Sequence, residues 1–323
     1  MKIAIPNKYK SFDDAKSGKG FFASRLTKAL ILRGCEVTHD PADKADFTIG
    51  LGKFMSRPKG LKILRVGGVH IDSNMDCKKL NKAKKAELAK ADGVIFVSKW
   101  VKAAFIELVG RPKVPTTVIH NGASFIEEHE NTFNYHSPYK VNFLASAHVW
   151  NRQKRLKHII AAFIRANIPD SGLWVCGEKT PKTECANIEF LGNVDQKTLH
   201  SLYKKCCCLI DLTYLSACPN TVVEALVAGC PVICTPNGGT HELLELHHPK
   251  PGTVLNHEPM FEVIKPVDLK KPPELNVERL AEEMKYYAEN KITFMISELH
   301  IEEVAQQYIL FIRRLKYGHK DSG

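Results

Sequence analysis

Short apolar runs alternate with amphipathic stretches along most of the chain. The runs are rich in β-branched residues, which is typical of buried parallel strands, and the stretches between them place apolar residues at helical spacing. Within residues 1–135 this pattern predicts strands at 2–6, 36–38, 47–50, 62–66, 93–97 and 116–119, and helices at 21–32, 78–91 and 99–109. The order indicates a doubly wound α/β domain. Gly122, just after the last of these strands, is expected to take a positive φ.

The alternation stops at a polar segment, residues 127–140, and then restarts. The second half predicts strands at 141–144, 173–177, 188–192, 209–212 and 232–234, and helices at 157–166, 197–204 and 222–228. The tail is expected to hold no strand but two helices, at 277–290 and 297–316. We therefore expect two Rossmann-like domains, residues 1–135 and 136–296, that face each other across a cleft, with a helix at about 297–318 returning to the first.

The composition is that of a soluble globular protein, with 44% apolar and 25% charged residues among 323. No apolar run is long enough to span a bilayer, and the N-terminus reads as a strand and not as a signal peptide. We therefore expect a cytoplasmic protein. In that compartment the ten cysteines are expected to be reduced and to act as small buried residues rather than metal ligands.

Positive charge is concentrated in the first half of the chain. Residues 1–135 hold 24 lysines and arginines against 14 aspartates and glutamates, a net charge of +10, whereas the remainder holds 22 against 21. An anionic partner of the first half is therefore expected: a membrane surface, a phosphorylated carrier or a nucleic acid. The lysines of the predicted helix at 78–91 are interpreted as a solvated helix face, and docking to anionic lipid or DNA phosphates is the alternative.

The segment at residues 218–233 carries the most specific chemistry. Asn220 and Glu224 lie on an amphipathic stretch that follows Pro219, ends at Gly229 and leads directly into an apolar strand. The N-terminus of such a helix offers backbone N–H groups and its dipole to phosphate, and a carboxylate on the helix can accept hydrogen bonds from both ribose hydroxyls. The segment therefore indicates a sugar-nucleotide site.

Several stretches, taken in order, resemble the large group of retaining nucleotide-sugar glycosyltransferases of the GT-B fold, family 4. They are Gly18 and Gly20 in a predicted glycine loop, residues 97–100, 118–122, 154–156 and 189–194, and the segment 218–233 with Gly-Gly-x-x-Glu after it at 238–242. The resemblance implies transfer of a sugar from an NDP-sugar, a UDP-sugar before others, to an acceptor hydroxyl with retention of configuration. No Asp-x-Asp motif flanked by apolar strands is present, so we expect no metal requirement and no other cofactor.

The resemblance places the donor in the second domain. Glu224 would bind the ribose hydroxyls, and Lys154 would stabilise the leaving phosphate, whose charge grows in the transition state. Two positions depart from the family pattern: Ser216 replaces a glutamate that helps to hold the sugar, and Val149 replaces an arginine, for which Arg152 is the nearest substitute. The donor-site candidates are completed by Gly18, Gly20, Arg155, Asn193, Val194 and the backbone N–H groups of Asn220, Thr221 and Val222.

The first domain is then expected to bind the acceptor. The chain leaves a predicted strand at Arg65 and enters a loop that contains His70 and Asp72, which is where such folds place active groups. These three residues are the acceptor-site candidates. His70 and Lys154 are the candidate catalytic residues, although a purely structural His70 is an equally open alternative.

Three hypotheses follow for the function. The first is a glycosyltransferase that acts on a glycan or a lipid-linked glycan, as a cytoplasmic protein that can be peripheral at a membrane. The second is a phage-type enzyme that glycosylates a modified base in DNA. The third is a non-catalytic sugar- or nucleic-acid-binding module, which Ser216 favours but which the presence of Glu224 and Lys154 disfavours. No obligate protein partner is evident from the sequence.

Overall fold

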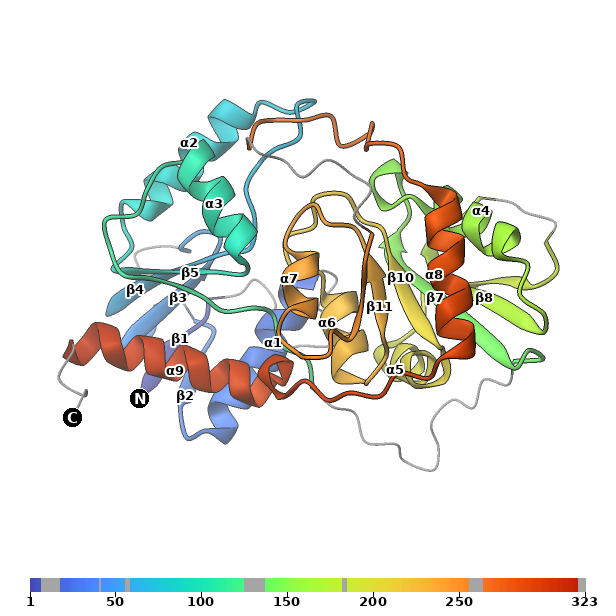
Figure 1. The fold of residues 1–323 in the computed structure, drawn as a ribbon. Coiled ribbons are helices and arrows are strands. Elements are labelled where there is room, and N and C mark those ends of the chain that lie inside the picture. Colours follow the sequence, from blue (N-terminus) through green and yellow to red (C-terminus); the bar gives the residue numbers. More distant parts are fainter. Residues whose placement is uncertain are drawn as a thin grey trace. The chain divides into compact units, whose positions relative to one another are not determined.

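A computed structural model describes residues 1–6, 18–40, 42–55, 59–124, 137–181, 185–255 and 264–318 (Figure 1). The chain forms two compact units. Unit 1 comprises Met1–Ser124, Glu262–Val267 and Glu298–Gly323, and unit 2 comprises Phe125–Phe261 and Asp268–Ser297. Each unit is built around its own six-stranded sheet, so the two predicted α/β halves are both present.

All strand pairs in the sheet of unit 1 are parallel, in the order β2-β1-β3-β4-β5-β6. From β1 the chain moves to β2 on one side, and it then returns to add β3 and the later strands on the other side. The pair β1–β3 is therefore the point at which the winding changes direction. The strands are β1 (Lys2–Ala4), β2 (Glu36–Thr38), β3 (Phe47–Leu51), β4 (Leu61–Val66), β5 (Gly93–Phe96) and β6 (Thr116–Val118).

Helices cover both faces of this sheet (Figure 1). On one face lie α2 (Cys77–Leu88) and α3 (Lys99–Leu108), and on the other lie α1 (Gly18–Leu32) and α9 (Ile301–Tyr317). The described part of α1 runs from Gly18, so the prediction that Gly18 and Gly20 belong to a loop is wrong: both are helical.

The C-terminal helix completes the core of unit 1, as the sequence predicts. Apolar side chains of α9 pack with those of α1 and of the strands in one cluster, which includes Phe22, Leu26, Phe47, Tyr308 and Ile312. The expected positive φ of Gly122 is wrong. A Cβ atom at Gly122 would lie 2.9 Å from Val304 Cγ2 and 3.0 Å from Ile301 Cα, so glycine is needed because α9 passes so close.

The sheet of unit 2 is also entirely parallel, in the order β12-β11-β10-β7-β8-β9. Its edge strand β12 was not predicted, because its three residues are only half-buried and form no apolar run. Gly252 opens that strand, and a Cβ there would lie 2.0 Å from Val232 O. The strands are β7 (Val141–Val149), β8 (Ser171–Glu178), β9 (Ile188–Gly192), β10 (Cys208–Asp211), β11 (Val232–Cys234) and β12 (Gly252–Val254).

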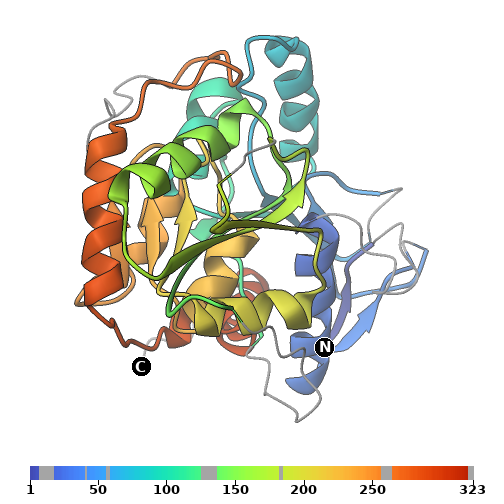
Figure 2. The ribbon, with the colours of Figure 1, turned by 90° about the vertical axis from the view of Figure 1, so that its right-hand side faces the viewer.

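The longest helices of unit 2, α4 (Leu156–Ala166) and α8 (Val277–Glu289), lie side by side (Figures 1 and 2). Their apolar sides join the strands in a core that includes Phe143, Ile159, Phe163, Leu280 and Met284. Helix α5 (Gln196–Lys205) packs against α6 (Asn220–Val227). The short helix α7 (Thr240–Leu244) and the 3₁₀ turns η1 (Arg152–Lys154) and η2 (Ser297–Leu299) complete the described elements.

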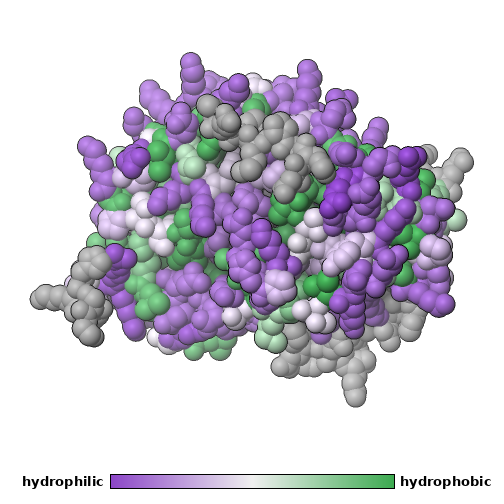
Figure 3. Space-filling model, in the orientation of Figure 1, coloured by the Kyte–Doolittle hydropathy of each residue, from purple (hydrophilic) through white to green (hydrophobic). Residues whose placement is uncertain are grey.

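The cysteines are small interior residues, as predicted. All ten are free thiols, and eight of them are buried. Burial raises the pKa of Cys176 to about 12, so this thiol stays protonated. Among the described residues no helix is long and apolar enough to cross a bilayer, and hydrophilic residues predominate on the face shown in Figure 3.

Candidate active site

In unit 2 the loops that follow β7 and β10 lie at the switch point of the sheet. These strands are neighbours, but the chain continues from β7 towards β8 and β9 and from β10 towards β11 and β12. Ligands of doubly wound sheets bind outside the carboxyl ends of the strands at such a point, because the loops diverge there. The two loops are residues 150–155 and 212–219, and both carry residues that the sequence singled out.

The two loops are tied to each other by hydrogen bonds. Gln153 Nε2 donates to Tyr214 O at 2.7 Å, and Tyr214 N donates to Gln153 O at 3.0 Å. Arg155 donates to Leu212 O at 3.4 Å and to Pro273 O at 2.8 Å, with its guanidinium 5.5 Å from the centre of the Tyr214 ring. Arg155 is 2% exposed and therefore braces the two loops from inside; its predicted role in phosphate binding stays a prediction.

Lys154 lies between the ends of β7 and β10. Its Nζ donates to Val149 O at 2.8 Å. Burial lowers the pKa of Lys154, and the negative charge of Asp211 opposes that shift. Asp211 ends β10 and is buried, and burial raises its pKa even though Thr213 N donates to its Oδ1 at 2.9 Å. The structure thus supplies an acidic neighbour of Lys154 that the sequence did not reveal, because Asp211 reads there as part of an apolar strand.

Helix α6 begins at Asn220, directly after Pro219, and no side chain caps it. The predicted N–H donors of Asn220, Thr221 and Val222 are therefore the first turn of the helix, whose N–H groups have no partner within the helix itself. The side chain of Val222 is buried in the core, so only its backbone can serve a ligand. Glu224 follows on the same helix and is half-buried; after burial, its charge is the largest cause of the raised pKa of Tyr203.

Ser216 lies against the glycine pair that precedes α7. Ser216 and Gly238 form a parallel bridge, and Gly239 N donates to Ser216 O at 2.6 Å. Gly238 has a φ of 105°, and a Cβ there would lie 2.4 Å from Ser216 O. Glycine at position 238 is therefore required by the close approach of the Ser216 loop.

Asn193 and Val194 lie at the same edge of the sheet, after β9. Asn193 is exposed, and its Nδ2 donates to Glu178 Oε1, at the end of β8, at 2.5 Å. Val194 is half-buried between β9 and α5. The carboxyl ends of β7, β8, β9 and β10 thus carry most of the donor-site candidates at one edge of unit 2.

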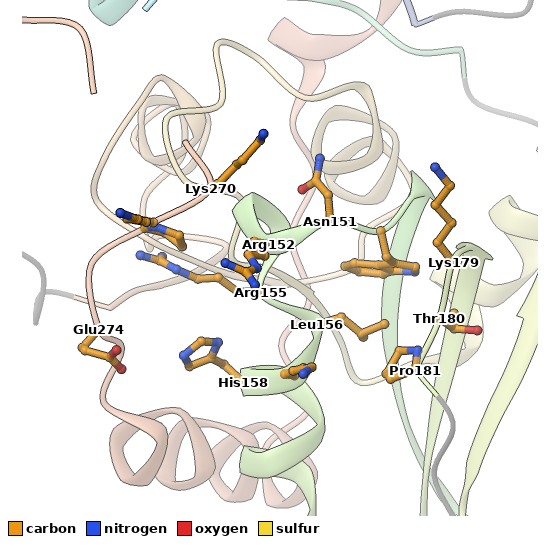
Figure 4. A pocket seen from close by; sticks show the side chains of 14 residues that line it. Asn151, Arg152, Arg155, Leu156, His158, Lys179, Thr180, Pro181, Lys270 and Glu274 are labelled. Carbon is orange, nitrogen blue, oxygen red and sulfur yellow. The ribbon is translucent and has the colours of Figure 1, made fainter. Parts of the chain in front are cut away.

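A cavity of about 580 Å³ opens beside the loop that follows β7 (Figure 4). Trp150, Leu156, Pro181 and Pro272 give it an apolar wall. Among the described residues that line it, Glu274 supplies the one carboxylate, and the basic side chains are more numerous: Arg152, Arg155, Lys157, Lys179, Lys270 and Lys271. Its volume is that of a small-molecule site, and its charge suits an anion. Lys154 and Glu224 are not part of this wall, so the predicted donor residues fall into two neighbouring groups.

In unit 1 the three acceptor-site candidates differ in exposure. Arg65 is 5% exposed; it donates from Nε to Tyr308 Oη at 3.1 Å and from Nη2 to the side chain of Asn121, and its guanidinium lies 4.1 Å from the centre of the Phe22 ring. Arg65 therefore joins β4 to both α1 and α9, while its role towards an acceptor stays a prediction.

His70 and Asp72 lie in the loop between β4 and α2. Asn81 on α2 holds the backbone of His70, accepting from its N at 3.0 Å and donating to its O at 2.8 Å. Burial lowers the pKa of the half-buried His70 imidazole, and Lys84 lowers it further, so the ring is neutral at neutral pH. The Asp72 carboxylate accepts from Asn74 N at 3.1 Å and from Asn74 Nδ2 at 2.8 Å and so shapes the turn before α2.

Comparison with known protein families gives a match over residues 127–307 to the model described as Glycosyl transferases group 1. The chain belongs to this family. It is therefore a glycosyltransferase that takes its sugar from a nucleotide sugar. No protein with curated annotation matches the chain in sequence.

Solved structures similar to this glycosyltransferase share its fold over nearly the whole chain. Sucrose-phosphate synthase (tll1590) from Thermosynechococcus elongatus is 14% identical with a TM-score of 0.68, covering 98% of this chain and 99% of its own. Anabaena Alr3699/HepE in complex with UDP-glucose is 13% identical with a TM-score of 0.60, covering 97% and 99%. WaaG, a glycosyltransferase involved in lipopolysaccharide biosynthesis, is 16% identical with a TM-score of 0.58, covering 95% of each chain. The predicted GT-B fold and the enzyme hypothesis are confirmed.

Three basic residues of the cavity in this glycosyltransferase were not predicted from the sequence. Lys179, Lys270 and Lys271 come from two segments far apart in the chain. Each looks like an ordinary solvated surface charge by itself, since nothing in the sequence shows that the loop after β8 and the segment before α8 line one cavity. Only the fold brings them together.

Proposed function

We propose that this glycosyltransferase moves a sugar from a UDP-sugar to an acceptor hydroxyl with retention of the anomeric configuration and without a metal ion. The diphosphate binds at the switch point of unit 2, between Lys154 and the first turn of α6, and Glu224 binds the ribose hydroxyls. The observation that carries the proposal is that Lys154 and the uncapped start of α6 belong to two loops that Gln153 and Tyr214 hold together. The complex of HepE with UDP-glucose supports the choice of UDP.

The chemistry follows from the charges of this site. As the bond between the sugar C1 and the phosphate oxygen breaks, a bond forms between C1 and the acceptor oxygen, and the acceptor proton passes to the departing phosphate. Negative charge grows on that phosphate, so a fixed cation at Lys154 and the dipole of α6 stabilise the transition state more than the ground state. With Ser216 in place of a carboxylate, the backbone N–H groups of the first turn of α6 hold the diphosphate.

We further propose that residues 136–296 bind the donor and that residues 1–135, with the helix at about 297–318, bind the acceptor. His70 orients the acceptor hydroxyl as a neutral hydrogen-bonding group. The acceptor is a glycan or a lipid-linked glycan at a membrane surface, which the net charge of +10 in residues 1–135 supports. The same charge supports a modified base in DNA as the second candidate. Salt-sensitive binding to duplex DNA and no binding to anionic vesicles would favour that second candidate.

The ribose role of Glu224 is tested by the variant Glu224→Ala. Loss of a carboxylate that accepts two hydrogen bonds is expected to weaken UDP binding by about tenfold or more, since each hydrogen bond to a charged group contributes about 1.5–3 kcal/mol. Isothermal titration calorimetry with UDP gives the affinity. Glu245→Ala is the matched control, because it removes an exposed carboxylate of the same unit and should leave the affinity unchanged. Equal affinity in wild type and Glu224→Ala, with both proteins folded, would remove the ribose role.

A further inference from the structure

The switch point of unit 1 lies between β1 and β3 and is flanked by lysines. Lys19 lies in the first turn of α1, the helix that follows β1, and Lys53 follows the end of β3. Gly52 N donates to Arg65 O at 2.8 Å, so the loop that carries Lys53 is fixed against the end of β4. The start of α1 and the ends of β3 and β4 therefore share the edge where doubly wound sheets bind ligands.

Helix α2 adds a third lysine to this edge. Asn81 binds the backbone of His70 at one point of the helix, and Glu87 Oε2 accepts from Phe54 N at 2.8 Å at another. Lys84 lies between these two anchors, one turn after Asn81 and one turn before Glu87, and is half-buried. The helix thus holds Lys84 between the loop of His70 and the loop of Lys53.

Arg65 connects the first turn of α1 to the same place. The Phe22 ring, one turn after Lys19, lies on the buried guanidinium of Arg65 at the end of β4. Lys19 is consequently close enough to Arg65, Lys53 and Lys84 for their charges, after burial, to lower its pKa. Burial also lowers the pKa of Lys84. Each of these shifts means that the surroundings disfavour the charged form of the lysine.

No carboxylate offsets this charge within the described part of the chain. Lys19, Lys53 and Lys84 form no ion pair with any described residue. Glu87 is the acidic side chain anchored beside them, and it is bound by Phe54 N and by Lys90 Nζ at 2.6 Å. Cations gathered at a ligand-binding edge without ion-pair partners suit an anion of more than one negative charge.

We infer that Lys19, Lys53 and Lys84 form a binding site for a phosphate group carried by the acceptor, beside His70. A compact group of three lysines suits one phosphate, whereas a duplex would need cations spread along its length. The inference rests on the proposed function only where it names the ligand as the acceptor. The phosphate site itself is argued from the residues of unit 1 alone.

The site is tested by titrating the full chain with inorganic phosphate in the presence of saturating UDP. Lys19→Ala, Lys53→Ala and Lys84→Ala are each expected to weaken phosphate binding by about fivefold, and the double variant Lys19→Ala/Lys84→Ala to abolish it. Lys82→Ala is the matched control, an exposed lysine of the same helix, and should bind phosphate like the wild type. Phosphate binding that is equal in the wild type and the double variant would overturn the inference.

UDP binding by the same variants separates this inference from the proposed function. If UDP binds all variants equally and phosphate binding falls as expected, both stand. If UDP does not bind the wild type but phosphate binding still depends on Lys84, the proposed function fails and the phosphate site stands. If UDP binds but no lysine variant changes phosphate binding, the phosphate site fails alone.

The source of the phosphate is decided by two further probes. Glucose 6-phosphate represents a soluble sugar phosphate, and vesicles that contain phosphatidylglycerol represent a lipid phosphate. Binding of either probe that weakens in Lys84→Ala but not in Lys82→Ala supports the site and names its source. If both probes bind more weakly to Lys82→Ala and Lys84→Ala to the same degree, the effect belongs to the general charge of α2, and the site is overturned. The site is also overturned if duplex DNA is the one ligand whose binding depends on Lys84.

Discussion

At the scale of single residues, Lys154 combines a charge with an environment that disfavours it. Its ammonium group is half-buried on Val149 O, near the buried carboxyl of Asp211. Burial dominates, so the pKa of Lys154 lies below its usual value. A phosphate stabilises the charged form of such a lysine more than that of a solvated lysine, because the protein itself compensates the positive charge only in part.

The lowered pKa of Lys154 predicts how UDP binding depends on pH. The protonated lysine binds the diphosphate, so the affinity for UDP should be highest at neutral pH. As the pH rises, the affinity should begin to fall before the pH reaches about 10.4, the pKa of an ordinary lysine. The variant Lys154→Arg stays protonated in this range and should hold a constant affinity. Calorimetric titration with UDP between about pH 7 and pH 10 gives both curves. If the UDP affinities of the two proteins change with pH in parallel, Lys154 does not contact the phosphate.

Single residues also show how far the sequence could define the site. Helix α6 and the place of Glu224 on it were predictable because Pro219, the helical periodicity and the following strand are all local features. Asp211 and the cavity lysines were not, since an aspartate in an apolar strand and a lysine in a loop acquire a role only from neighbours distant in sequence. The buried bracing by Arg65 and Arg155 was missed for the same reason: a basic residue beside a predicted site looks like a ligand until its partners are known.

At the scale of elements, the site depends on how η1 and the loop before α6 are joined. The Gln153–Tyr214 hydrogen bonds and the Arg155 brace fix the turn after β7 against the loop after β10. A rigid pair of loops keeps Lys154 and the first turn of α6 in place before a ligand arrives, which reduces the ordering cost of binding.

The variant Gln153→Ala is therefore expected to weaken UDP binding by about three- to tenfold without any loss of direct contact, since one loop-to-loop hydrogen bond contributes about 0.5–1.5 kcal/mol. Gln196→Ala, an exposed glutamine at the start of α5, is the control and should match the wild type. The affinity for UDP is the measurement. A wild-type affinity in Gln153→Ala would mean that the loops stay in place without this bond.

The elements that sequence patterns identified are those long enough to show a period. Helices α3, α4 and α8 and strands β3, β4 and β10 fell close to their predicted ranges, whereas β7 extends to Val149, well beyond its predicted end at residue 144. The strand β12 and the helix α7, with three and five residues, are too short for periodicity. The helical state of residues 18–20 was missed because Gly-Lys-Gly has poor helix propensity and is stabilised by its tertiary position.

At the scale of the whole molecule, unit 1 is assembled from both ends of the chain. Arg33, directly after α1, pairs with Glu303 on α9 at 3.0 Å, and Tyr308 lies fully buried against Phe22 in the shared core. The exposed ion pair contributes little to stability, whereas the buried aromatic side chain contributes several kcal/mol. The stability of unit 1 therefore depends on α9.

Tyr308→Ala should destabilise unit 1 by about 3–5 kcal/mol, because it leaves a cavity in the core and removes the partner of Arg65. Hydrogen exchange measured by mass spectrometry should show lost protection in α1 and β1, while β7 and β8 of unit 2 keep theirs. Tyr317→Ala removes a tyrosine of the same helix that is 59% exposed and should change little. Equal loss of protection in both units would mean that they unfold together.

The place of α9 also bears on how the protein is made. Arg33 and its hydrogen-bond partner Gln306 stand 273 positions apart, so a ribosome that has finished the strands of unit 1 must still synthesise all of unit 2 before α9 emerges. During that interval Phe22, Leu26 and Leu30 lack the helix that covers them. The nascent first unit is therefore a natural client for a chaperone until α9 has emerged, whereas unit 2 can fold as soon as α8 has left the ribosomal tunnel.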